Sequence, residues 1–215
     1  MEAYLIQSGF LKFNFGFEIL FAIITILVSI FAFRIYELTK KRELKLFSIG
    51  FLMFGLSYLV RAAMTFVRIP GCRECMRLRG PVMYWQAIVG QAHVFFFMLG
   101  LVLLIYMTLQ IRDRKIMAVL FGVIVILLFG ARQLALFHVL SAFLMIFVVS
   151  YYYNNYQKHR KFQTGIVLVA FIFIFLAQIS LIFSVHDAGL FMLGRLLELA
   201  GYLCILGNLA LTLKK

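Results

Sequence analysis

Apolar stretches of about 20 residues recur along the chain, and short segments between them carry most of the charged residues. A helix needs about 20 mostly apolar residues to cross the hydrocarbon layer of a bilayer, which is roughly 30 Å thick. The pattern predicts seven membrane-spanning helices, at residues 16–37, 46–68, 83–110, 116–131, 133–154, 163–184 and 190–212. We therefore expect an all-α, polytopic membrane helical bundle that forms a single domain over residues 1–215.

The composition agrees with lipid as the main solvent. Hydrophobic residues make up 65% of the chain, charged residues make up 13%, and Phe alone occurs 25 times. A soluble domain of this length could not place so much apolar surface in water. The net charge of +13 would suggest nucleic acid in a soluble protein, but here the basic residues fall mostly in loops. We expect membrane lipids, and not nucleic acid, to be the partners of these charges.

The basic residues also predict the orientation. The side on which the odd-numbered spans end holds thirteen Lys and Arg, and the opposite side holds six. Basic loops stay in the cytoplasm, so this count predicts an extracytoplasmic N-terminus and a cytoplasmic C-terminus in a multi-pass protein of the plasma membrane. Only Glu2 and Lys12 are charged before the first span, which we interpret as an anchor and not as a signal peptide.

Polar side chains recur at helical spacing within several spans. On the first span, Glu18, Ala22, Thr25 and Ser29 follow one another at intervals of three and four residues, so they share one face. Ionisable groups in a span require a partner, a cavity or access to the interface. The orientation places six such residues in the outer half of the bundle, and we predict that they bind a ligand in a polar pocket: Glu18, Arg61, His93, His138, Arg195 and Glu198.

Structural roles are the alternative for the same residues. Buried polar side chains often only bond a neighbouring helix. Arg195 and Glu198, one turn apart, can neutralise each other, and Arg61 and Glu18 can extend toward the headgroups.

Three histidines suggest further chemistry. His93, His138 and His186 lie on the predicted outer side with carboxylates nearby, a donor set that suits zinc, although no H-E-x-x-H or other close ligand spacing occurs. His93 and His138 could instead be axial ligands of a b-type haem. No catalytic motif accompanies them, so the sequence leaves enzymatic activity undecided and requires no cofactor.

An outer loop holds Cys72 and Cys75 as C-x-x-C among several arginines. Two cysteines at this spacing outside the cytoplasm can close a small disulfide or exchange with other thiols. Cys204, in the last predicted span, we interpret as a packing residue.

Two segments carry a resemblance. The stretch YELTKKRELKLFSIGFLMFGLSYLVRAAMT, from Tyr36 to Thr65, resembles the first loop and second helix of small seven-helix membrane sensors, which occur in some histidine kinases and as stand-alone archaeal proteins. The C-terminal LGRLLELAGYLCILGNLALTLKK is similar to the final helix of the same archaeal group. The resemblance implies a sensor module, and without an output domain its signal would pass to a separate membrane or signalling protein.

The leading hypothesis is therefore a receptor-like sensor that binds a small or lipidic ligand in an extracytoplasmic pocket. The second is an intramembrane enzyme or electron carrier that uses the histidines with a metal or haem. A transporter is third, because no internal repeat is evident and the two prolines, Pro70 and Pro81, lie together in one loop instead of interrupting spans.

Overall fold

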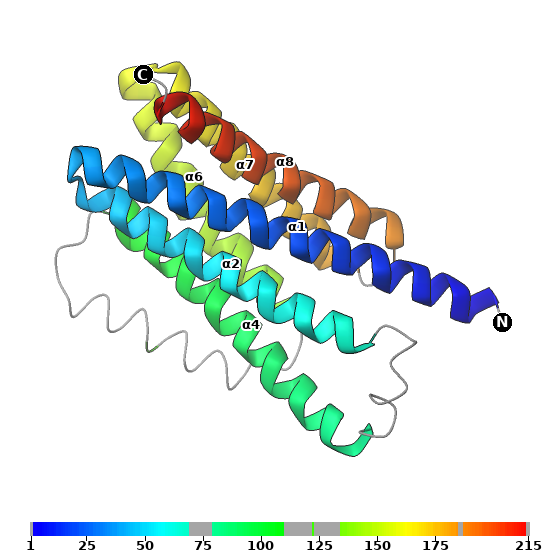
Figure 1. The fold of residues 1–215 in the computed structure, drawn as a ribbon. Coiled ribbons are helices and arrows are strands. Elements are labelled where there is room, and N and C mark those ends of the chain that lie inside the picture. Colours follow the sequence, from blue (N-terminus) through cyan, green and yellow to red (C-terminus); the bar gives the residue numbers. More distant parts are fainter. Residues whose placement is uncertain (1, 69–78, 110–121, 123–133, 185–186, 214–215) are drawn as a thin grey trace.

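The computed structural model describes residues 2–68, 79–109, 122, 134–184 and 187–213. Within these ranges the long elements are all helices: α1 (Glu2–Thr39), α2 (Arg42–Arg68), α4 (Arg79–Thr108), α6 (Leu134–His159), α7 (Phe162–Phe183) and α8 (Ala188–Leu213). Each of these helices is long and apolar enough to cross a membrane (Figure 1). The protein is a multi-pass integral membrane protein, as its hydrophobic pattern predicts.

The helices extend beyond the predicted spans at several ends. α1 begins at Glu2, whereas the prediction began at residue 16. Polar residues such as Lys12 and Asn14 end the apolar run without ending the helix, since neither residue breaks a helix. The predicted fourth span, 116–131, lies outside the described residues except for residue 122, so six of the seven predicted spans have a described helix.

Two of the connections between helices are only two residues long. α1 and α2 are joined by Lys40 and Lys41, and α6 and α7 by Arg160 and Lys161. Lys40 has φ 55° and Arg160 has φ 45°, the left-handed conformation that ends a helix abruptly. These tight turns hold each pair of helices antiparallel and keep basic residues at one end of the bundle.

Contacts between helices define the two ends of the bundle. At the N-terminal end, where α1 begins, Tyr58 late in α2 bonds Glu198 early in α8, and His138 early in α6 bonds Gln178 late in α7. At the C-terminal end, where α8 finishes, one cavity is lined by residues from the last turns of α1, α6 and α8. Accordingly α1, α4, α6 and α8 run in one direction and α2 and α7 return, with the chain termini at opposite ends (Figure 1).

The polar stripe predicted on the first span faces the interior. Glu18, Ala22, Thr25 and Ser29 are all buried, and the opposite face of α1 exposes large apolar residues such as Ile23 and Ile30. A helix with its small and polar residues inward and its apolar residues outward suits lipid surroundings.

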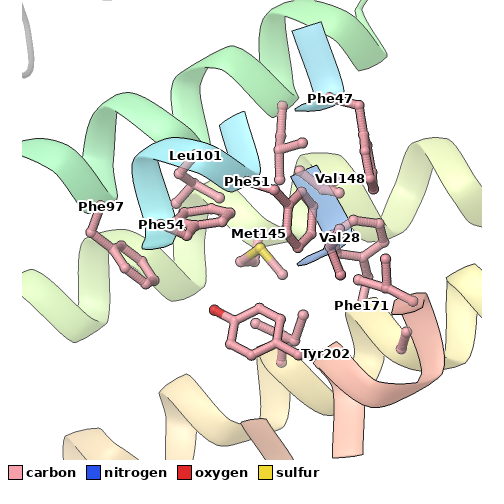
Figure 2. Close-up of a cluster of buried hydrophobic side chains, with 14 of the residues drawn as sticks. Val28, Phe47, Phe51, Phe54, Phe97, Leu101, Met145, Val148, Phe171 and Tyr202 are labelled. Carbon is pink, nitrogen blue, oxygen red and sulfur yellow. The ribbon is translucent and has the colours of Figure 1, made fainter. Parts of the chain in front are cut away.

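Aromatic rings fill the middle of the bundle. Phe51, Phe54, Phe97, Phe171 and Tyr202 come from four different helices and gather in one buried cluster with Val28 and Met145 (Figure 2). This layer separates the polar residues of the N-terminal end from the cavity at the C-terminal end.

Candidate functional site

An ion pair between α1 and α2 lies at the N-terminal end of the bundle. Arg61 Nε is 2.8 Å from Glu18 Oε1, and Asn14 Nδ2, one turn earlier on α1, donates to the same oxygen at 2.8 Å. Glu18 is fully buried, whereas the Arg61 side chain keeps 20% of its surface exposed. The second carboxylate oxygen, Glu18 Oε2, is buried without a described hydrogen-bond partner.

A second ion pair lies on α8. Arg195 Nη1 donates to Glu198 Oε2 at 3.0 Å, and both residues are almost completely buried. The guanidinium carbon lies 5.7 Å from the centre of the Phe21 ring and 5.1 Å from that of Phe191, so aromatic faces supply part of its solvation. Arg195 Nε and Nη2 have no hydrogen-bond partner among the described residues.

Tyr58 joins α2 to this α8 pair. Its hydroxyl donates to Glu198 Oε1 and lies 3.0 Å from the hydroxyl of Tyr202. The ring of Phe21 packs against both tyrosines, with centroids 5.1 Å from Tyr58 and 5.9 Å from Tyr202. Glu198 therefore accepts hydrogen bonds from its own helix and from α2.

His93 on α4 is bound through one ring nitrogen. Its Nδ1 lies 3.0 Å from the carbonyl oxygen of Ser57 and 2.6 Å from the Ser57 hydroxyl, which itself donates to the His93 carbonyl at 2.9 Å. A carbonyl only accepts, so Nδ1 carries the proton, and the neutral ring presents Nε2 as a free acceptor. Nε2 is buried and has no described partner.

His138 stands apart from the charged residues. Its Nδ1 donates to Gln178 Oε1 on α7 at 2.8 Å, and its contact with the other residues runs through the Phe137 ring, which lies 5.7 Å from that of His93. The structure thus brings five of the six predicted residues close together and leaves His138 at the edge. We call the following set the polar cluster: Glu18, Tyr58, Arg61, His93, Arg195, Glu198 and Tyr202.

The predicted metal and haem sites have little support in the described part of the chain. There, no group of three His, Cys, Asp or Glu side chains is close enough to hold an ion, and His186 lies outside the described residues. The Phe137 ring packs against both imidazoles, with its centroid 5.7 Å from that of His93 and 4.9 Å from that of His138, which leaves less room for a haem beside these histidines. Cys72 and Cys75 also lie outside the described residues, and Cys204 is a half-buried free thiol.

Tyr58 is the functional candidate that the sequence did not reveal. A tyrosine in the outer part of a span is usually read as part of an interfacial belt. Its position three residues before Arg61, on the same helical face, was the available signal.

The cavity at the C-terminal end was also not predicted. Its volume is about 390 Å³, and its apolar walls include Ile35, Phe47 and Leu209. Lys41 lies at its edge, and Asn208 contributes a buried Oδ1 that has no described partner. The C-terminal half of the bundle therefore has a candidate binding site of its own, although it contains few buried ionisable residues.

Comparison of the chain with protein-family models, with curated proteins and with solved structures finds no match.

Proposed function

We propose that the protein is a receptor-like ligand-binding module of the membrane, and that the polar cluster takes a small solute that carries an anionic group and a hydrogen-bond donor. The observation behind this proposal is the set of buried atoms without partners in one place: Nε and Nη2 of Arg195, Oε2 of Glu18 and Nε2 of His93. Such groups each cost about 1–3 kcal/mol when left unbonded.

The two kinds of unpartnered atom define the ligand chemistry. Arg195 offers two N–H donors in a plane, which match a carboxylate or phosphate. Glu18 and His93 offer acceptors, which match an ammonium or hydroxyl group on the same ligand. The two ion pairs already balance the four charges of the cluster, so a zwitterionic or hydroxylated acid fits better than a simple anion.

We also propose that residues 116–131 form a seventh membrane span and that the C-terminal end of the bundle faces the cytoplasm. α4 and α6 run in the same direction, so the end of α4 at Thr108 and the start of α6 at Leu134 lie at opposite ends of the bundle. The segment between them contains the apolar run 116–131, which the sequence predicts to be a membrane span, and we propose that it crosses the membrane. The basic turns at Lys40 and Arg160 favour a cytoplasmic C-terminal end. The polar cluster would then face outward from the plasma membrane, and a separate protein would receive the signal.

Thermal unfolding of the purified protein in detergent tests the ligand site. The probes are a panel of amino acids, hydroxy acids, simple carboxylates and inorganic phosphate at millimolar concentration. A binder raises the Tm, because it stabilises only the folded state. The informative variant is His93→Gln, and its matched control is His138→Gln, because both replace a buried histidine bonded through Nδ1.

We expect at least one probe of the predicted class to raise the Tm of the wild type and of His138→Gln, but not that of His93→Gln. Arg195→Lys keeps a cation beside Glu198 while removing the planar pair of donors, so it should lose the response to that probe as well. An equal response of all variants, or no response to any probe, would contradict the proposed site.

A further inference from the structure

The described helices form two groups of three with the same path. The first unit is α1, α2 and α4, and the second is α6, α7 and α8. In each unit the first helix runs toward the C-terminal end, the second returns after a two-residue turn, and the third runs toward the C-terminal end again (Figure 1). No internal repeat is evident in the amino-acid sequence, so any correspondence between the units lies in their backbone geometry and contacts.

The two turns match in detail. Lys40 and Arg160 both have positive φ, and each donates its backbone N–H to the carbonyl of a tyrosine four residues earlier. These bonds, to Tyr36 and Tyr156, are both 2.7 Å long. All four positions are related by a shift of 120 residues, from 36 to 156 and from 40 to 160.

A close backbone approach between the second and third helices follows the same shift. A Cβ on Gly100 of α4 would lie 2.7 Å from the carbonyl oxygen of Gly50 on α2. A Cβ on Gly201 of α8 would lie 2.8 Å from the carbonyl oxygen of Ala170 on α7. Position 50 corresponds to 170 by the shift of 120, and position 100 corresponds to 201 by a shift of 101.

A second contact between the same helices, two turns away along the pair, agrees with the same two shifts. His93 of α4 bonds the carbonyl of Ser57 on α2, and Gly194 of α8 approaches the carbonyl of Ala177 on α7. Residue 57 corresponds to 177 and residue 93 to 194, again by 120 and 101. The third helix therefore packs on the second in the same register in both units.

The interface between the units is symmetric too. α1 packs against α8, and α4 packs against α6. Exchanging the two units exchanges these two contacts, because each joins the first helix of one unit to the third helix of the other. The units are therefore related by an approximate two-fold axis that runs along the helices. Parallel repeats of this kind are a known architecture of membrane carriers.

The interface is closed by polar contacts at one end and hollow at the other. At the N-terminal end, Tyr58 of the first unit bonds Glu198 and Tyr202 of the second. At the C-terminal end, the cavity of about 390 Å³ lies between Ile35 and Phe47 of the first unit and residues of the second.

One face of α8 connects these two places. Glu198, Tyr202, Ile205 and Asn208 are all buried, and the helical rise places Asn208 about 15 Å from Glu198 along the axis. Ile205 and Asn208 line the cavity, whereas Tyr202 packs with its ring 6.2 Å from that of Phe51 in the aromatic layer. A solute that left the polar cluster along this face would reach the cavity.

We propose that the protein is a carrier whose two three-helix units rock against each other, so that the N-terminal and C-terminal ends of their interface open in turn. Among the described residues, the C-terminal end of the interface holds the cavity, and the N-terminal end is joined by the bond from Tyr58 to Glu198. The proposed motion is argued from the two units and their interface, and does not depend on the ligand site proposed above. Only the chemical class of the transported solute rests on that proposed site.

Thiol labelling from each side of sealed vesicles tests the motion without a known solute. The chain is first freed of its own cysteines, and one reporter is added at each end. Leu209→Cys reports from the cavity, and Ala22→Cys reports from a fully buried position next to Phe21 at the N-terminal end. The reagent is membrane-impermeant sulfonatoethyl methanethiosulfonate.

The perturbation is Tyr58→Phe, which removes the hydroxyl that bonds across the interface. Its matched control is Tyr106→Phe, because the buried Tyr106 accepts a hydrogen bond from Arg42 within the first unit. We expect Tyr58→Phe to speed labelling of Ala22→Cys by about tenfold or more, and to slow labelling of Leu209→Cys. Tyr106→Phe should change neither rate.

A second substitution probes the coupling over the length of the interface. Asn208→Trp fills the cavity and so prevents closure of the C-terminal end. It should lower the labelling of Ala22→Cys, both in the Tyr58→Phe background and alone, so the test survives if Tyr58→Phe fails to fold. The carrier proposal is overturned if the two ends do not respond reciprocally, or if Asn208→Trp leaves Ala22→Cys unaffected. A Tm response to the probe panel with no reciprocal labelling would leave the ligand site standing without the carrier.

Discussion

Replacement of Arg195 by methionine should destabilise the protein by about 3–5 kcal/mol, because it leaves the Glu198 carboxylate buried without a compensating cation. Both side chains are almost fully buried, so water cannot take over the solvation of the carboxylate. Tyr58 still donates one hydrogen bond to Glu198, but a single donor does not neutralise the charge.

Removing both charges should cost much less than removing one. In Arg195→Met/Glu198→Met neither charge of this pair remains, and the Tyr58 hydroxyl can still bond Tyr202, which lies 3.0 Å away. We expect the double variant to be more stable than the single variant by at least about 1–2 kcal/mol.

The free energy of unfolding can be measured in mixed dodecyl maltoside and SDS micelles by circular dichroism. Arg42→Met is the matched control, because Arg42 is exposed and its one described side-chain hydrogen bond goes to Tyr106; the substitution should cost about 1 kcal/mol. A double variant that is no more stable than Arg195→Met would refute the reasoning, since the loss would then come from packing and not from the unpaired carboxylate.

Two further predictions concern helix packing. Gly100→Ala and Gly201→Ala should each destabilise by about 1–3 kcal/mol, because the added methyl meets a backbone carbonyl across the helix pair, whereas Gly207→Ala, with open space around it, should be neutral or slightly stabilising in the same unfolding assay. Gln178→Leu should cost about 0.6–1.7 kcal/mol through loss of its hydrogen bond to His138, and an unchanged free energy of unfolding would show that the bond is not stabilising.

The sequence predicted which faces of the helices are buried. Polar side chains in a membrane protein pack inside the bundle and away from lipid, so they recur along the sequence at the spacing of one helical face. Glu18, Thr25 and Ser29 recur at helical spacing and are buried together, as are Arg195 and Glu198. Their partners across helices could not be predicted in this way, since periodicity fixes a face of one helix but says nothing of which neighbour it meets. The ion pair between Glu18 and Arg61 and the bond from Tyr58 to Glu198 both depend on that choice.

The cavity escaped prediction for a related reason. Its walls are apolar residues such as Ile35 and Leu209, which in a membrane sequence look the same whether they face lipid, a neighbouring helix or empty space. Asn208 is a buried polar residue of the cavity wall, but a single asparagine in an apolar span has many structural explanations.

The correspondence between the two units shows why a repeat can persist in contacts after it has vanished from the residues. What each unit conserves is close backbone approach, as at Gly100 and Gly201, and the positive φ of its turn. The side chains between these points differ: residue 18 is a glutamate and its counterpart 138 is a histidine, yet each is buried and bonds the second helix of its own unit. The same difference makes the polar cluster asymmetric. The two ion pairs join Glu18 to Arg61 and Arg195 to Glu198. The corresponding positions in the other unit hold His138 and Leu181, and Val94 and Phe97, which form no ion pair. If the two units rock as proposed, the two ion pairs form the boundary of the ligand site at one end of the interface. The backbone contacts that the units share keep each unit rigid during the movement.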